Sequence, residues 1–308
     1  MPALTGPAPA KINLALKILD PRPDGFHELR TIFQTISLAD RLTVGYQRQG
    51  PRKVEIRCAD PELENPANLA VRAAAALLQA GPWRGRVTLT LEKKIPWGAG
   101  LGGGSSDAAA VLRALQRLLK PQPAASLVFQ VAAALGSDVP FFLVGGTALG
   151  IGRGEEVYPL PDGPGAWLVL LAPELRIPTP EAYQALRRQR PRLTADSRRN
   201  IINGFCSGVS VSEDRGMQDL AGAPPDCFEN DFEAVVFHRH PELRKWKNRL
   251  VRLGASRAML SGSGSALFGI FPDRNRALAA RAAFDVFPGK VYVVRTLSRR
   301  SYQRFWKP

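Results

Sequence analysis

The spacing of apolar side chains along the chain predicts several strands. Residues 11–18 alternate between apolar and polar side chains, a period of two that is typical of a strand with one buried face. Residues 53–59 and 86–95 follow the same pattern. Residues 166–173 form a continuous apolar run, which indicates a buried strand, and residues 258–271 predict a strand, a glycine turn and a second strand.

Other segments have the composition and spacing of helices. Residues 68–81 begin with Asn68, a preferred N-cap residue, and end at a glycine. Residues 105–119 start with Ser-Ser-Asp, which is typical of a helix N-terminus, and repeat their apolar residues on one face. The segments 124–136 and 240–254 also predict helices that stop at a glycine.

The order of these elements indicates the fold class. Strands and helices are mixed without a regular βαβ alternation, which predicts an α+β fold rather than a doubly wound α/β fold. Residues 137–160 are expected to form mostly short strands and turns, and residues 204–226 a mobile loop. The proline- and glycine-rich stretch before residue 165 predicts two domains, 1–163 and 164–308.

Composition narrows the class of protein. No apolar run reaches the roughly 18 residues that span a bilayer, and no signal peptide precedes the first strand, so we expect a cytoplasmic protein. The three cysteines form no C-x-x-C pair, and we expect no metal-ligand cluster. The net charge of +15 suits anionic partners, whether nucleic acid, acidic membrane or phosphorylated metabolites, although a solvated basic surface explains it equally.

A cluster of glycines in residues 95–109 carries the strongest chemical signal. A flexible linker does not fit, because a predicted strand precedes the cluster and a predicted helix follows it. A dinucleotide-binding loop needs a buried apolar strand before it and an acidic residue about 20 positions later, and neither is present. Glycines before a helix N-terminus instead predict a phosphate cradle, with the Ser105 and Ser106 hydroxyls available to a phosphate or Mg²⁺.

Three further residues are candidates for chemistry. By residue type alone, Asp138 is a turn or N-cap aspartate, Lys11 a solvent-facing strand lysine and His27 a surface turn residue. A kinase that acts on a hydroxyl needs a carboxylate to accept its proton and cations to spread the developing charge. Asp138 and Lys11 would supply these groups if the fold brings them together. His27 could stack on a base and hydrogen-bond to it. The spacing of these residues along the chain does not show whether either arrangement occurs.

Taken together, these segments resemble the GHMP small-molecule kinases. The resemblance rests on PAKINLALKI, PDGFHELRTIFQTISLAD, NLAVRAA, IPWGAGLGGGSSDAA, GSDVPFFLVGGTALGIGRGE, IPTPEAY, NDFEAVV and SGSGSALFGIF, which span residues 8–271 in the family's order. The pairing of DGFHEL with GLGGGSSDAA is similar to that branch of the family which phosphorylates a cytidine-diphosphate-linked methylerythritol, in the non-mevalonate route to isoprenoid precursors.

The resemblance implies a two-domain fold with ATP between the domains. The N-terminal domain would be of the ribosomal protein S5 domain 2-like type and the C-terminal domain ferredoxin-like. One of the lysines at positions 93 and 94 would lie near the adenine, and Mg²⁺ is expected because phosphoryl transfer from ATP needs charge neutralisation. The residues matched to ATP binding are Asn68, Leu69, Lys94, Pro96, Gly98, Gly100, Leu101, Gly102, Gly103, Gly104, Ser105 and Ser106.

The resemblance also implies a catalytic pair and a substrate pocket. Asp138 would take the proton from the substrate's tertiary C2 hydroxyl, while Lys11 lowers the pKa of that hydroxyl and holds Asp138 in place. Position 26 is usually tyrosine in the family, and phenylalanine here keeps the ring but removes a hydroxyl. The residues matched to substrate binding are Asn13, Phe26, His27, Thr179, Tyr183 and Gly262.

Two other functions stay open at this level. The chain could be a GHMP kinase for another small alcohol, such as mevalonate or homoserine. A nucleic-acid-binding protein would use the basic charge, but the basic residues are scattered and only the C-terminal tail pairs aromatic residues with arginines. We therefore expect a small-molecule substrate, no nucleic acid and no membrane as partners, and a monomer or homodimer. No role is predicted for residues 204–226 or for the basic tail.

Overall fold

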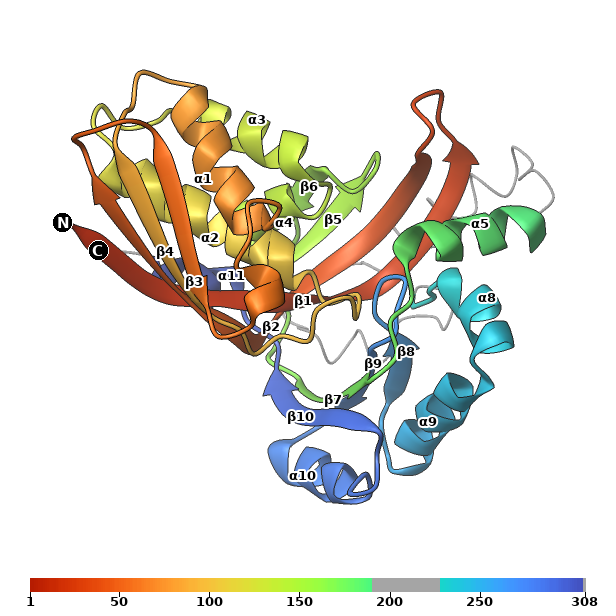
Figure 1. Cartoon of the computed structure of the whole chain (residues 1–308). Helices are drawn as coiled ribbons and strands as arrows, with labels where there is room; N and C mark the ends of the chain where they lie inside the picture. Colours follow the sequence, from red (N-terminus) through yellow and green to blue (C-terminus); the bar gives the residue numbers. More distant parts are fainter. Residues whose placement is uncertain (190–227, 307–308) are drawn as a thin grey trace.

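The computed structural model describes residues 1–189 and 228–306, which form two β-sheets, each covered by helices (Figure 1). Two long strands, β1 (Ala3–Pro21) and β2 (His27–Gln47), form an antiparallel hairpin that runs through the whole N-terminal half. Along its other edge, β2 pairs first with β5 (Thr147–Ile151) and then with β4 (Arg86–Glu92).

Two shorter strands complete the first sheet, and four helices cover it. β3 (Lys53–Cys58) runs parallel to β4, and β6 (Glu156–Pro159) pairs with β5. The side chains of β4 alternate between exposed and buried, as the sequence predicts. The helices and the short 3-10 turn that precedes them are η1 (Pro61–Leu63), α1 (Leu69–Gln79), α2 (Gly103–Leu118), α3 (Ala125–Leu135) and α4 (Val139–Val144).

The second sheet has the strand order β10-β7-β9-β8. Its strands are β7 (Trp167–Pro173), β8 (Arg257–Leu260), β9 (Leu267–Phe271) and β10 (Gly289–Arg295). Helices α5 (Thr179–Gln189), α8 (Phe232–Arg239), α9 (Pro241–Arg252) and α10 (Arg274–Ala282) contribute to an apolar core with this sheet. A separate apolar cluster joins the two halves, because Ile12 and Leu14 of β1 pack against Leu168 and Phe268 of the second sheet.

The basic C-terminal tail returns to the N-terminal half through α11 (Arg299–Arg304). The Tyr302 hydroxyl donates to the Phe142 carbonyl at 2.5 Å, and the Trp306 indole donates to the Pro7 carbonyl at 3.0 Å. Both rings are almost fully buried, and burial raises the pKa of Tyr302 to about 12. The tail is therefore part of the packing of the N-terminal half rather than a loose extension.

Several sequence predictions are confirmed by the elements observed. The α+β class holds, Asn68 caps α1 by accepting from the Ala70 amide at 2.9 Å, and α3 ends at Gly136. The strand, turn and strand predicted over residues 258–271 are β8, a glycine turn and β9. The domain boundary near residue 163 stays a prediction, although the change from one sheet to the other falls between β6 and β7.

Other predictions are wrong in ways that bear on the site. Residues 11–18 do not expose a polar face, because the face that bears Lys11 and Asn13 is buried as well. Residues 139–144 form helix α4 rather than a strand or turn, and α2 begins at Gly103, two residues before the expected start. The expected loop 204–226, with Cys206, and Cys227 lie outside the described residues.

Two features of the described residues bear on membrane and metal binding. Within 1–189 and 228–306, every helix is too short or too polar to cross a membrane. The same residues contain no cluster of three or more histidine, cysteine, aspartate or glutamate side chains that could hold a metal ion.

Candidate active site

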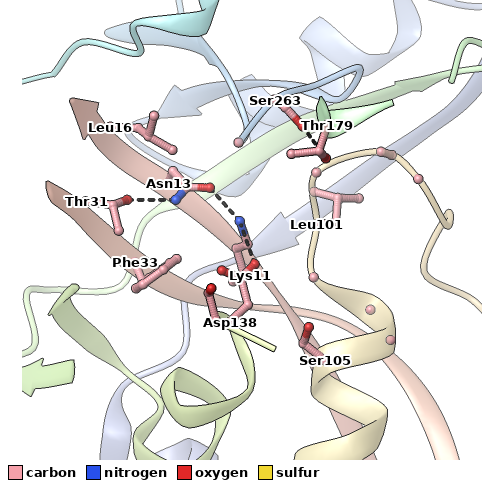
Figure 2. Close-up of a pocket in the computed structure, with 18 of the residues that line it drawn as sticks. Lys11, Asn13, Leu16, Thr31, Phe33, Leu101, Ser105, Asp138, Thr179 and Ser263 are labelled. Atoms are coloured by element: carbon pink, nitrogen blue, oxygen red, sulfur yellow. Dashed lines mark hydrogen bonds and ion pairs between the residues drawn. The ribbon is translucent and has the colours of Figure 1, made fainter. Parts of the chain in front are cut away.

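A cavity of about 460 Å³ lies where the two halves meet. Its walls come from the β1–β2 hairpin, the glycine segment before α2, the residues before α4, the start of α5 and the glycine turn between β8 and β9 (Figure 2). Segments far apart in sequence therefore contribute to one cavity, and it opens between the first sheet and the C-terminal half.

The floor of the cavity is a chain of hydrogen bonds on the polar face of the hairpin. Lys11 and Asn13 share this face because successive side chains of a strand point to opposite sides. The Lys11 ammonium donates to the Asn13 side-chain oxygen at 2.7 Å, the Asn13 amide donates to the Thr31 hydroxyl at 2.7 Å, and that hydroxyl donates to the Ala15 carbonyl. These hydrogen bonds fix the position of the Lys11 ammonium group, which also lies 5.4 Å from the centre of the Phe33 ring.

Asp138 faces Lys11 across the cavity (Figure 2). One carboxylate oxygen of Asp138 lies 3.3 Å from the Lys11 ammonium, and the side chains are 32% and 5% exposed. Asp138 occupies the N-cap position of α4, as its residue type indicates, but its side chain makes no capping hydrogen bond. A partly exposed carboxylate held by a buried cation is suited to accept a proton from a bound hydroxyl group.

The glycine segment 98–104 forms the wall beside this pair. Gly98, Gly100 and Gly102 all have positive φ, a conformation that favours glycine. A Cβ atom at Gly100 would lie 2.2 Å from the Ser261 carbonyl oxygen, so only glycine permits this contact between the two glycine turns. Gly104 has open space beside it, because a Cβ atom there would meet no other atom within 4 Å.

The N-terminus of α2 opens onto the cavity. The first amide hydrogen bond at this end runs from Ser106 to the Gly102 carbonyl, so the preceding amides of Gly103, Gly104 and Ser105 lie before the start of the ladder. Such amides, with the positive end of the helix dipole, are suited to bind phosphate oxygens. This geometry fits the phosphate cradle expected from the sequence.

A buried ionic cluster anchors the glycine segment. The Lys93 ammonium contacts the carboxylates of Asp40 and Asp107, and Asp40 also accepts from the backbone amides of Lys94 and Ile95 at 2.5 and 2.8 Å. The Lys93 ammonium therefore forms ion pairs with two buried carboxylates. Burial raises the pKa of Asp107 to about 8, opposed by the attraction of Lys93 and assisted by the charge of Asp40. The cluster positions the strand, the glycine segment and α2 relative to one another.

The glycine turn 261–265 closes the cavity from the C-terminal half. The Asn230 side-chain amide donates to the carbonyls of Leu260 and Gly262 at 2.9 and 2.8 Å, which fixes the turn. The Ser261 hydroxyl donates to the Gly100 carbonyl at 3.1 Å, so the two glycine turns bond directly. The hydroxyls of Thr179 and Ser263 lie 3.0 Å apart and link this turn to the start of α5.

Aromatic rings line the other end of the cavity. The His27 and Tyr183 rings stack with centroids 5.1 Å apart, and Tyr183 meets Phe232 edge-on at 4.9 Å. His27 is buried rather than a surface turn residue, whereas Phe26 is 52% exposed. Burial, with a contribution from Asp138, raises the pKa of Tyr183 to about 12. Because His27 and Tyr183 contact each other, a planar ligand has to bind beside this stack and not between its rings.

A smaller hollow of about 350 Å³ adjoins this aromatic end. It shares Phe26, His27, Thr179 and Tyr183 with the main cavity and extends to Pro180. Together the two spaces bring the Lys11–Asp138 pair and the aromatic rings into one site.

Most residues that the sequence assigned to the site line the main cavity, and Asn68, Lys94 and Ser106 do not. The Asn68 side chain caps α1 and donates to the Leu63 carbonyl. Lys94 is exposed outside the cavity wall, and the Ser106 hydroxyl is buried against the Pro9 carbonyl. The residues that line it are Lys11, Asn13, Phe26, His27, Leu69, Pro96, Gly98, Gly100, Leu101, Gly102, Gly103, Gly104, Ser105, Asp138, Thr179, Tyr183 and Gly262.

Sequence reasoning missed other parts of the wall. Thr31 and Phe33 lie on the same face of β2, and the alternation of that strand was the available signal. Arg153, in the turn between β5 and β6, had no signal beyond its glycine neighbours. The wall residues not expected from the sequence are Leu16, Leu29, Thr31, Phe33, Trp97, Ser137, Arg153 and Phe232.

Comparison with known proteins assigns both halves to one family. The family model of the GHMP kinases N terminal domain matches residues 68–146, and that of the GHMP kinases C terminal matches residues 217–288. A relative from Solibacter usitatus, a 4-diphosphocytidyl-2-C-methyl-D-erythritol kinase, is 49% identical over 97% of this chain and 90% of its own length.

Solved structures agree with this assignment. A crystal structure of 4-(cytidine 5'-diphospho)-2C-methyl-D-erythritol kinase superimposes with a TM-score of 0.76 at 37% identity, covering 95% of this chain and 99% of that one. Homoserine kinase from Cytophaga hutchinsonii gives a TM-score of 0.70 at 19% identity, covering 96% and 95% of the two chains. At that identity, the second match shows a shared fold alone.

Proposed function

Because the chain belongs to the family of 4-diphosphocytidyl-2-C-methyl-D-erythritol kinases, we propose that it phosphorylates the 2-hydroxyl group of that cytidine-diphosphate-linked alcohol. The phosphate donor of this family of kinases is ATP. The reaction belongs to the non-mevalonate route to isoprenoid precursors. The observation that carries the proposal is the Lys11–Asp138 pair, 3.3 Å apart, in a cavity that glycine-rich turns also line.

The chemistry follows from this pair. Asp138 accepts the proton of the 2-hydroxyl group as the hydroxyl oxygen attacks the γ-phosphorus of ATP, and the bond from that phosphorus to the β-phosphate oxygen breaks to release ADP. Lys11 holds Asp138 in place and stabilises negative charge on the attacking oxygen. Asn13 and Thr31 fix the Lys11 ammonium through their hydrogen bonds, so they act as positioning residues.

The glycine segment is the proposed site of the ATP phosphates. Its positive-φ glycines and the amides at the start of α2 present N–H groups to the cavity, and Ser105 adds a hydroxyl. Leu69, Pro96 and the exposed ring of Trp97 lie on the same wall and suit the adenine. Asn68, Lys94 and Ser106 are not included in this site because their side chains lie elsewhere.

The oxygen atoms in the cavity also suit Mg²⁺. Mg²⁺ is usually held by one or two protein oxygens together with phosphate oxygens and water, so a cluster of carboxylates is not required. The Ser105 hydroxyl lines the cavity beside the glycine segment and is the protein group that would hold it. When bound, Mg²⁺ neutralises charge on the ATP phosphates.

The aromatic end is the proposed cytidine site. Phe26, His27 and Tyr183 supply ring faces and one polar ring edge, the features that a pyrimidine base requires. Thr179, Asn13 and Gly262 line the same cavity as the catalytic pair. Two adjoining spaces of about 460 and 350 Å³ suit an extended substrate better than a small alcohol such as mevalonate or homoserine.

One assay tests the proposal against the other alcohols. ADP release is measured with ATP and, in turn, the cytidylylated methylerythritol, mevalonate and homoserine. Turnover is expected with the first alone. Turnover with mevalonate or homoserine, and none with the cytidylylated alcohol, would contradict the proposal. The cytoplasmic location and the state as monomer or homodimer stay predictions.

A further inference from the structure

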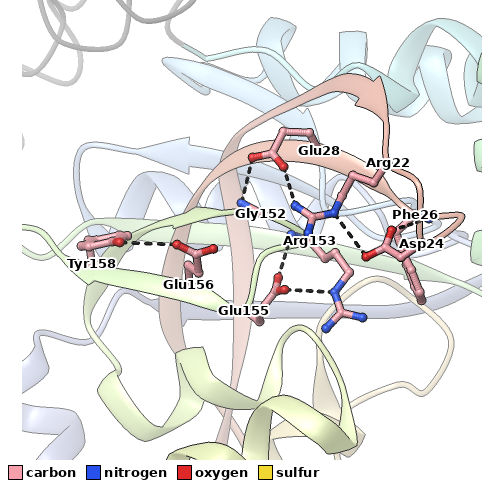
Figure 3. Close-up of polar contacts among 9 residues, drawn as sticks. All are labelled: Arg22, Asp24, Phe26, Glu28, Gly152, Arg153, Glu155, Glu156 and Tyr158. Carbon is pink, nitrogen blue, oxygen red and sulfur yellow. Dashed lines mark hydrogen bonds and ion pairs between the residues drawn. The ribbon is translucent and has the colours of Figure 1, made fainter.

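Arg153 occupies a defined position at the edge of the cavity. It lies between Gly152 and Gly154, both of positive φ, in the turn that joins β5 to β6. Glu155 accepts from its backbone amide at 2.6 Å and from its side-chain Nε at 3.0 Å (Figure 3). Its guanidinium lies 4.9 Å from the centre of the Phe26 ring. One edge and one face of the guanidinium are thus fixed by the protein.

The turn that carries Arg153 is tied to the tip of the β1–β2 hairpin. Glu28 accepts from the Gly152 amide at 3.1 Å and from Arg22 at 2.7 Å. Arg22 also bonds to Asp24, which accepts from the Phe26 amide at 3.1 Å. Phe26 and Arg153 are therefore held on one polar network, so their mutual position is a fixed feature of the site.

The terminal nitrogens of Arg153 make no hydrogen bond to the described residues. Figure 3 shows them pointing away from Glu155, and the residue lines the cavity with a side chain that is 30% exposed. Among the described residues that line this cavity, Lys11 is the other lysine or arginine, and its ammonium already contacts Asn13 and Asp138. Arg153 is accordingly the cation with donors available to a bound ligand.

We propose that Arg153 binds the diphosphate group that joins cytidine to the methylerythritol, a role that rests on the function proposed above. Covalent structure places this diphosphate between the base and the alcohol. Arg153 adjoins Phe26 at the aromatic end and lines the same cavity as Asp138. Its planar, permanently charged fork matches two phosphate oxygens, and its charge offsets that of the diphosphate.

A role in base recognition fits the contacts less well. The guanidinium covers one face of the Phe26 ring, so a cytosine cannot stack on that face without displacing it. Cytosine also offers no anionic group to a guanidinium. The contact with Phe26 instead holds the guanidinium of a residue that lines the cavity, where the phosphates are expected.

The test compares ligands with and without phosphate. Binding of cytidine 5'-diphosphate and of cytidine is measured by calorimetry, with the ATP site filled by a non-hydrolysable ATP analogue. Arg153→Met is expected to weaken diphosphate binding roughly 10- to 100-fold, the range of a charge-assisted hydrogen bond, and to leave cytidine binding within about 2-fold. The KM of the full substrate rises in parallel while the KM of ATP is unchanged. For Arg153→Lys we expect an affinity for cytidine 5'-diphosphate between those of the wild type and Arg153→Met.

Arg276→Met is the matched control, because it removes the same charge from helix α10 at a residue that is 70% exposed and lies outside the cavity wall. It should leave the preference for the diphosphate over cytidine unchanged. Equal weakening of both ligands by Arg153→Met would show that Arg153 only supports Phe26, and a rise in the KM of ATP alone would place it on ATP. Either result overturns the inference. Absence of wild-type turnover with the cytidylylated alcohol would instead overturn the proposed function.

Discussion

The Lys11 ammonium lies 3.3 Å from the Asp138 carboxylate, although the two residues come from the first strand of the chain and from the start of a helix more than a hundred residues later. Lys11 is almost fully buried, and burying an ammonium is costly unless it is paired and hydrogen-bonded. Asp138, Asn13 and the Phe33 ring supply those partners. The pair therefore combines a fixed cation with a carboxylate that a ligand can reach.

Removing the proton acceptor should abolish turnover and spare ATP binding. Asp138→Asn keeps the size of the side chain but cannot accept the hydroxyl proton, so we expect kcat to fall by roughly 10²- to 10⁴-fold, the usual contribution of a general base. ADP release measures the loss, and fluorescence titration measures ATP affinity. Asp285→Asn is the control, since its side chain is 72% exposed shortly after α10 and outside the cavity wall. Near-normal turnover by Asp138→Asn would refute the assignment of the base.

Loss of the histidine ring should affect the cytidylylated substrate alone. His27→Ala removes both the stack on Tyr183 and a polar ring edge, and we expect the KM of the cytidylylated alcohol to rise about 10-fold or more while the KM of ATP stays constant. Steady-state kinetics with each substrate varied in turn separates the two. The exposed His238 on α8 is the control site for the same substitution. An unchanged KM would argue for a kinase of another small alcohol.

Two glycines of the same segment should respond differently to alanine. Gly100 has a φ of +77° and a Cβ there would clash with the Ser261 carbonyl, so Gly100→Ala should destabilise the fold by about 1–3 kcal/mol and separate the glycine turns. Gly104 lies in α2 with open space beside it, so Gly104→Ala should leave stability equal or about 0.5–1 kcal/mol higher. Denaturant unfolding measures both.

ATP affinity is the second measurement for the alanine variants at Gly100 and Gly104. At Gly104 the added methyl group enters the space proposed for the phosphates, so the KM of ATP should rise although the protein is as stable as the wild type. A stable Gly104→Ala protein with unchanged ATP affinity would show that the phosphates do not lie against this part of α2.

The buried cluster of Lys93 should give stability a pH dependence. The pKa of Asp107 is 3.8 in the unfolded chain and about 8 in the folded protein, so the folded state binds a proton more tightly. That contribution is complete below pH 3.8 and is lost as the pH rises through about 8. Asp107→Asn cannot ionise, so its stability relative to the wild type should increase over this window. Urea unfolding at several pH values tests the trend, and parallel curves would contradict it.

The chain by itself determined most of the local structure near the site. Alternation in residues 86–92, the cap at Asn68 and the glycines ahead of α2 are properties of neighbouring residues, and they need no distant partner to act. The glycine turns and helix start of the proposed phosphate cradle were predictable for the same reason, because glycine conformation and the helix N-terminus are local. The resemblance then indicated the branch of the family that the comparisons confirm.

Only the tertiary structure decided which polar residues converge. The alternation of β1 indicated that Lys11 and Asn13 share a face, but burial of that face follows from the cavity floor that β1 and β2 build together. Helix α4 was missed because its six residues are too few to show a helical period and follow a glycine. Thr31, Asp107 and Arg153 received no role from the sequence, since their partners are brought to them by strand pairing and helix packing over long separations. Local patterns fix the elements of this protein, and long-range packing fixes the distances between side chains on which its chemistry depends.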